Sequence, residues 1–433
     1  MSSRSAAASA SALTPVVSRP HAVEAEANLG RRTLPNGVAY ALATAVVGLG
    51  LFASLTPSPL YHVYAERWHF SALTLTLIYA TYAFGVLATL LLAGRVSDDV
   101  GRRPVLLVAL GTLMVSTLVF TFAGSVVWLF VARALQGLAT GAALSAAGAA
   151  MLDLHPRRDP TSVALANGVA AATGIGLGML VSSSLVQFGS APRVLPYVVL
   201  LGLFAIAFAG AYWMPESVAA RGRFRLTWER PSVPAQVRRP FLLASLAVLS
   251  SWSIAGLFSS LGPQLSAHLF NSTNVIVSGI GIIALAGSAA VAQVLLGRTA
   301  PWIGASAGSV GLAAGMFLVV VAAATESSVA FVAGSIVGGS GFGVAYLGGL
   351  RALVAVIPNE RRAAVLSAFY LVAYISISVP AVLAGVVVSH LGLQATFETF
   401  GSVVVGIALV VAFEAWRTRP TKNSRSLTVV PVS

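Results

Sequence analysis

Eleven residues that begin at Gly94 combine two glycines, two acids and three arginines in the run G-R-V-S-D-D-V-G-R-R-P. Gly94 and Gly101 permit a tight turn between two apolar segments. Asp98 can pair with Arg102 or Arg103, or it can cap a nearby helix N-terminus. Such a cluster can act as a conformational latch that holds two parts of a protein in one state. A plain topology anchor is the alternative, but it would explain only the arginines.

This latch motif resembles the loop 2–3 signature of the major facilitator superfamily, which reads roughly G-x-x-x-D-[RK]-x-G-R-[RK]. Asp99 departs from the signature, because a basic residue is usual at that place. The resemblance extends over about residues 38–415 and implies a transporter fold, without identifying a substrate. It also implies that Asp153, at the end of the fourth apolar segment, joins the arginines of the latch motif. A solvated helix end is the alternative for Asp153.

The fourth apolar segment carries a second motif, Arg133, Gln136, Gly137 and Gly141. It resembles the R-x-x-Q-G-x-x-x-G pattern of many proton-coupled members of the same family. At about 1.5 Å per residue, Arg133 lies roughly 10 Å inside the membrane boundary, where a charge needs a partner. It could bind an anionic substrate or modulate a nearby proton site. The alternative is an arginine that snorkels outward and braces its helix.

Further candidates are small, polar or aromatic residues inside apolar segments. Gly174 and Gly178 share one face of the fifth segment and permit close helix packing. They loosely resemble a helix 5 motif of exporters that expects proline where Ile175 stands, so packing is the preferred interpretation. Four residues near the middle of their segments are candidates for a substrate cavity, with helix packing as the alternative for each: Trp252, Ser253, Tyr346 and Tyr374.

Ionisable groups that could couple transport to protons are scarce. No Asp, Glu or His falls in the middle third of any predicted helix. Glu398, about one turn into the last apolar segment, is the only acid within a helix on the outer side. Two alternatives stay open: no proton coupling, or coupling through Glu398 or through Asp98 and Asp153. Arg351, near the inner end of the tenth segment, is expected to snorkel to the membrane interface.

The elements that position these residues must be membrane helices. Of the 433 residues, 57% are hydrophobic and only 9% are charged, whereas soluble domains carry roughly a quarter charged residues. Each apolar run is too long for a membrane strand, and only helices satisfy their own backbone polar groups in lipid. Twelve runs are predicted: 38–57, 71–93, 104–123, 126–152, 161–187, 194–214, 241–262, 274–296, 302–323, 328–356, 363–389 and 394–415.

One connection is long, and it divides the chain near its middle. Residues 215–240 hold six arginines and are interpreted as a cytoplasmic linker between halves at 38–214 and 241–415. The Gly-Arg pair at 94–95 recurs at 297–298, an offset of 203. Two parallel repeats place a substrate cavity between the halves, near the midplane. The predicted fold is an all-α membrane protein with 12 transmembrane helices in two pseudo-symmetric six-helix bundles.

The basic residues predict the orientation of the chain. With the N-terminus inside, 22 of the 26 basic residues fall in inside regions, and only Arg67 and Arg193 fall in outside loops. This distribution follows the positive-inside rule. Residues 1–37 and 416–433 are then cytoplasmic tails, and the first is expected to be disordered. A multi-pass protein of a bacterial-type inner membrane, with both termini cytoplasmic, is expected.

Together these features favour a secondary active transporter that moves a small solute by alternating access. Proton-coupled efflux of drugs or metabolites is one form of it. An uptake carrier of the same fold and a non-transporting sensor or scaffold are the alternatives. We do not expect an enzyme, because the chain has no cysteine and no H-E-x-x-H helix. We expect no cofactor, no metal and no nucleic acid, and a monomer surrounded by the lipid bilayer.

Overall fold

The computed structural model describes residues 33–93, 96–218, 232–358 and 361–419, and within these ranges the chain forms helices and no strand. The first part of the chain folds into α2 (Asn36–Leu55), η1 (Ser58–Leu60), α3 (Tyr61–Trp68), α4 (Ala72–Ala93), α5 (Val96–Val100), α6 (Arg102–Thr121), α7 (Val126–Leu154), α8 (Pro160–Phe188) and α9 (Leu195–Tyr212). The second part folds into η2 (Ala235–Val237), α10 (Arg238–Ser260), α11 (Gly262–Leu269), α12 (Val275–Leu296), α13 (Pro301–Thr325), α14 (Ser328–Val354) and α15 (Arg362–Arg417).

Side-chain caps begin three of the long helices. Asp159, Asn274 and Ser327 accept hydrogen bonds from backbone N–H groups in the first turns of α8, α12 and α14, which satisfies donors that have no partner within the helix. Hydrogen bonds from the Ser162 hydroxyl and from the Thr161 N–H hold the pKa of the Asp159 carboxyl below its usual range. These residues therefore determine where the helices start.

Eleven helices of the described chain are long and apolar enough to cross a membrane. One of them, α15, has 56 residues and contains a single non-helical position, Gly392, with φ 81° and ψ 174°. At about 1.5 Å per residue, such a helix is more than twice the thickness of a bilayer core, so it must cross the membrane twice. Counting α15 as two spans gives twelve, and the predicted all-helical membrane fold is confirmed.

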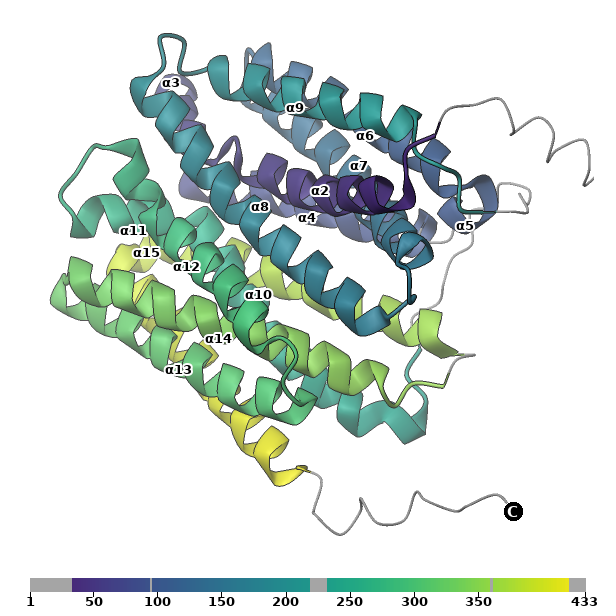
Figure 1. Ribbon diagram of the computed structural model, residues 1–433. Helices are drawn as coiled ribbons and strands as arrows, with labels where there is room; N and C mark the ends of the chain where they lie inside the picture. The colour runs from purple at the N-terminus through teal and green to yellow at the C-terminus, as the bar shows by residue number, and fades with distance from the viewer. Residues whose placement is uncertain (1–32, 94–95, 219–231, 359–360, 420–433) are drawn as a thin grey trace, which may run out of the picture.

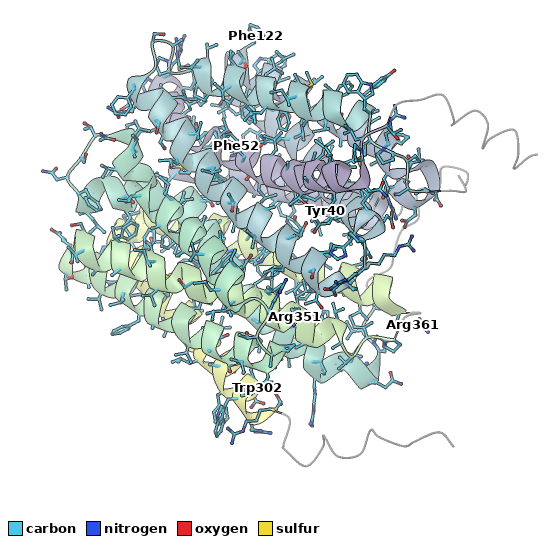
Figure 2. The ribbon with its side chains drawn as sticks, viewed as in Figure 1. Tyr40, Phe52, Phe122, Trp302, Arg351 and Arg361 are labelled. Carbon is cyan, nitrogen blue, oxygen red and sulfur yellow. The ribbon has the colours of Figure 1, made fainter. Side chains whose placement is uncertain are left out.

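Large apolar side chains cover the outside of the molecule. Phe122, which is 80% exposed, stands on the outer surface in Figure 2, and Val329 and Phe188 are similarly exposed. A water-soluble protein rarely leaves so much apolar surface uncovered. The surface therefore fits hydrocarbon as its solvent.

Figure 1 shows α2 to α9 and α10 to α15 as two neighbouring groups of helices, here called the first and second halves. The end of the bundle that carries α5 is called the linker end, and α3 and α11 lie at the opposite end. Apolar clusters such as the one around Leu110 and Phe204 lie wholly within the first half, and another around Val248 and Phe369 lies within the second. The halves meet where α8 packs on α12 and where α4 packs on α15.

Candidate functional site

Arg102, the first residue of α6, is the centre of a charged cluster at the linker end. Its guanidinium forms ion pairs with Asp98 and with Asp153 on α7, where the Nε–Oδ2 distance is 3.2 Å. The Arg102 Nη1 also donates to the Ser97 hydroxyl over 2.8 Å. The structure therefore brings together Asp98, Arg102 and Asp153, three residues of the sequence-derived latch motif. Gly94, which belongs to the same motif, lies outside the described residues.

A residue that the sequence reasoning missed, Glu216, completes this cluster. Its carboxylate accepts the backbone N–H groups of Arg102 at 2.9 Å and of Arg103 at 3.2 Å, and so caps α6. Gly101 precedes this cap with φ 112°, and a Cβ there would collide with the Glu216 carboxylate. The Ser217 hydroxyl donates to Asp153 over 2.8 Å. The start of the linker is thus bound to the cluster around Arg102.

The Arg103 guanidinium lies 5.2 Å from the centre of the Tyr212 ring. One feature of the sequence could have indicated Glu216. It is an acid that directly follows a proline, in Met-Pro-Glu-Ser, at the end of the sixth apolar run. Within the described residues, the partners of the Arg102 cluster named above come from the first half or from the start of the linker.

The first membrane helix breaks at Pro57 and Pro59, and the break leaves carbonyl groups without helical donors. Proline has no N–H, so Pro57 cannot donate to the Ala53 carbonyl one turn earlier. That carbonyl accepts the Gln136 Nε2 at 2.9 Å instead. The Ser54 carbonyl accepts the Arg133 Nη1 at 2.8 Å. Side chains of α7 therefore take the place of the donors that the break removes.

Arg133 is fully buried, at 0% exposure, in a cage of aromatic rings within the first half. Its Nε donates to the Tyr61 hydroxyl over 2.6 Å, and its Nη1 also donates to the Gln136 Oε1 over 2.7 Å. The guanidinium carbon lies 5.1 to 5.8 Å from the centres of four rings, those of Tyr61, Tyr79, Tyr82 and Phe120. These distances fit cation–π attraction. The alternative in which Arg133 snorkels outward is wrong, because the side chain points into the bundle.

The two glycines of the helix 4 motif bring α7 against α4. A Cβ at Gly137 would collide with the Tyr82 carbonyl oxygen, and one at Gly141 would lie 2.9 Å from the Val86 carbonyl oxygen. In the same way, a Cβ at Gly174 or Gly178 on α8 would collide with backbone carbonyl oxygens of α2. All four positions therefore permit backbones to approach each other closely.

Three of the four predicted cavity residues form one aromatic cluster. The Trp252 ring lies 5.2 Å from that of Tyr374 and 5.7 Å from that of Tyr346. Tyr374 packs against residues of α4, including Tyr82 and Val86, and so lies at the contact between the halves. The fourth residue, Ser253, is not part of this aromatic cluster. Its hydroxyl donates to the Ser376 carbonyl over 3.2 Å.

Glu398 and Arg351 have local partners away from the aromatic cluster. Glu398 accepts a hydrogen bond from Gln394 of its own helix over 2.8 Å, in an exposed position. Arg351, labelled in the second half in Figure 2, donates to the carbonyls of Gly297 at 2.6 Å and Thr299 at 3.0 Å. These carbonyls lie at the linker end of α12, and the snorkelling of Arg351 to the membrane interface stays a prediction.

Two cavities lie away from these residues. One of about 660 Å³ lies between Val233, Gln236 and Arg361 at the linker end. The other, of about 390 Å³, is an outer groove between α13 and α14, lined by Gly308 and Gly341 among others. Among the described residues, no group of three or more His, Asp or Glu side chains could hold a metal ion.

Comparisons with known proteins show similarity along much of the chain. The family model of the Major Facilitator Superfamily matches residues 38–346. The inner membrane transport protein YnfM of Escherichia coli (strain K12) is 27% identical over 278 residues, which is 60% of this chain and 63% of that protein. Multidrug resistance protein D of the same organism is 36% identical over 131 residues, 29% of this chain and 31% of that protein.

The human vesicular acetylcholine transporter is 35% identical over 139 residues, 31% of this chain and 26% of that protein. Each of these matches spans less than two thirds of the relative's length. The crystal structure of the human organic anion transporter MFSD10 (TETRAN) superimposes with a TM-score of 0.65 over 88% of this chain and 100% of that chain. At 17% sequence identity, the superposition shows a shared fold.

Proposed function

The chain belongs to the major facilitator superfamily, and we propose that it is a secondary transporter that moves a small solute across the membrane by alternating access. The observation that supports this proposal is the contact between the halves, which is made mainly by two helix pairs while each half also has an apolar cluster of its own. Two bodies that are each packed internally and meet mainly along two seams can rock against each other as units.

The seam between α8 and α12 is closed at both ends of the bundle. Away from the linker end, the Gln187 Oε1 accepts the Val275 N–H over 2.9 Å. At the linker end, the Leu165 side chain lies against Gly297. On the second seam, Thr76 of α4 lies against Gly385 of α15, at the end opposite the linker. Alternating access requires that the contacts at one end separate while those at the other end stay closed.

A wedge at one end of a seam is expected to open that end and close the other. Tryptophan at Gly385 cannot fit, because even a Cβ there collides with the Thr76 side chain. We expect Gly385→Trp to increase maleimide labelling of a Gln187→Cys reporter several-fold and to decrease labelling of a Leu165→Cys reporter. The protein has no native cysteine, so each reporter is the only thiol in its variant.

Gly202→Trp is the matched control, since a Cβ at Gly202 of α9 meets nothing within 4 Å. It should change the labelling of neither reporter. A static scaffold would show increased labelling at Gln187→Cys with unchanged labelling at Leu165→Cys, and that result would contradict alternating access.

We propose further that the protein lies in the cell membrane with the linker and both termini in the cytoplasm, in accordance with the distribution of arginines. Ser190 and Ser232 are both exposed, and they lie at opposite ends of the bundle. In intact cells, an impermeant maleimide should therefore label Ser190→Cys and leave Ser232→Cys unlabelled until the membrane is permeabilised. The reverse pattern would invert the proposed orientation.

A further inference from the structure

Arg133 carries a positive charge for which the described residues supply no negative partner. Its hydrogen-bond acceptors are a hydroxyl, a backbone carbonyl and an amide, and all of these are neutral. The acids nearest to the membrane core, Asp98, Asp153 and Glu398, have partners of their own elsewhere. A buried cation without a counterion is costly, and intramembrane charges normally pair with one another or with polar groups.

The guanidinium also keeps an unused donor. Its Nη2 is buried and has no hydrogen-bond partner within the described structure, although Nε and Nη1 are both engaged. Buried donors are nearly always satisfied, and an arginine serving only as a brace would be expected to use this one as well. A carboxylate, sulfonate or phosphate oxygen would satisfy both the donor and the charge.

Tyr82 connects this cation to the aromatic cluster at the contact between the halves. Its ring centre lies 5.5 Å from the Arg133 guanidinium carbon, and the same side chain packs in the apolar cluster that contains Tyr374 and Trp252. The cationic guanidinium and an aromatic surface are thus separated by a single ring. No described carboxylate contacts this cluster, so a cationic solute would find no anionic partner there and would be repelled by Arg133.

From this arrangement we propose that the solute is an amphipathic organic anion, whose negative group binds Arg133 and whose apolar or aromatic body packs on Tyr82, Tyr374 and Trp252. The inference rests on the proposed transport function and names its substrate class. The four rings around the guanidinium stabilise its charge before the anion binds, and the bound anion then replaces part of that stabilisation. Binding requires that Tyr82 or its neighbours move, since Arg133 is sealed from solvent in this structure.

The test compares three probes that share one ring system and differ in charge: 2-naphthoate, 2-naphthamide and 2-naphthylmethylamine. Their binding to the purified full-length protein in nanodiscs is measured by calorimetry and by quenching of tryptophan fluorescence. An ionic strength near 0.3 M screens attraction to exposed arginines. We expect 2-naphthoate to bind at least tenfold more tightly than the amide, and the amine more weakly still.

Arg133→Lys keeps the charge and loses the planar fork of donors, so we expect it to weaken 2-naphthoate binding at least tenfold. Arg351→Lys is the matched control, because the hydrogen-bond acceptors of Arg351 among the described residues are two backbone carbonyls just after α12. The affinity of this variant should equal that of the wild type. Trp252→Ala should weaken all three probes by a similar factor, and it supplies a second variant if Arg133→Lys does not fold.

The proposal is overturned if the amine or the amide binds as tightly as 2-naphthoate, or if a folded Arg133→Lys variant keeps wild-type affinity. Failure of this inference is distinguishable from failure of the proposed function. The labelling of the Gln187→Cys and Leu165→Cys reporters does not require any ligand, so alternating access can hold while the preference for anions does not.

Discussion

The Gly174→Ala variant is expected to unfold at a clearly lower temperature than the wild-type protein. A Cβ at this position would collide with the Gly48 carbonyl oxygen and would lie 2.8 Å from the carbonyl carbon. Both atoms belong to the backbone of α2, so no side chain can rotate to make room. Overpacking typically costs about 1–3 kcal/mol, while alanine regains up to roughly 1 kcal/mol in helix propensity. We expect a net loss of about 2 kcal/mol, because α2 and α8 must separate as rigid helices.

The matched control is Gly287→Ala on α12, where a Cβ would meet nothing within 4 Å. At that position only the gain in helix propensity from glycine to alanine remains. The variant should therefore be as stable as the wild type, or more stable by up to roughly 1 kcal/mol. Thermal unfolding in detergent, followed by the loss of helical circular dichroism, measures both variants. If Gly174→Ala were as stable as Gly287→Ala, the close contact between α2 and α8 would be disproved.

The Gln136→Leu variant is expected to lose a comparable or larger amount of stability. Leucine has nearly the same volume but no amide, so the Ala53 carbonyl would lose its donor and the Arg133 Nη1 would lose one of its two acceptors. Pro57 cannot supply the missing donor, for it has no N–H. A buried group left without its partner costs about 1–3 kcal/mol. With two groups affected, one of them charged, the expected loss is about 3 kcal/mol.

Gln293→Leu makes the same chemical change at a second buried glutamine and should not lower the stability of the protein. The Gln293 Oε1 has no hydrogen-bond partner within the described residues, and its Nε2 lies 3.4 Å from the Gly343 carbonyl oxygen, which is a long contact. Removing a poorly satisfied buried amide should be neutral or stabilising. Equal destabilisation by Gln136→Leu and Gln293→Leu, measured by thermal unfolding, would contradict the role assigned to the broken first helix.

The helices could be predicted from the sequence because their cause is local. Each backbone polar group must be satisfied within its own apolar segment, so length and composition suffice. The same reasoning does not predict how neighbouring spans are connected, as the boundary between the last two spans shows. A short loop was expected between residues 389 and 394, whereas α15 runs through this region with only Gly392 outside helical geometry.

The environment of Arg133 could be predicted only in part. Its burial follows from its depth within an apolar segment, but its acceptors depend on the helix break at Pro57 and Pro59, about 75 residues earlier in the sequence. The two prolines in Thr-Pro-Ser-Pro do signal a break. No rule of spacing indicates which distant donors fill it, since that depends on how α2, α4 and α7 pack together.

The cluster around Arg102 could likewise be predicted from the sequence only in part. Asp98 lies four residues before Arg102, and this spacing brings two side chains together on one helical face. The pairing of Asp98 with Arg102 was therefore among the alternatives that the sequence predicted. Glu216 lies more than a hundred residues further along the chain. Its contact with the start of α6 arises because α9 packs beside α6 and ends next to it, which is a property of the tertiary structure.

The turn at Gly392 has a practical consequence for handling and detecting the protein. The chain passes from one span to the next through a single residue with φ 81°, and Thr396 already donates its hydroxyl to the Gly392 carbonyl over 2.7 Å. An epitope tag or protease site inserted there would disturb two spans that are joined by this single non-helical residue. Residues 189–194 and 271–274 connect neighbouring helices at the same end, and they are the better positions for tags, for limited proteolysis and for raising antibodies.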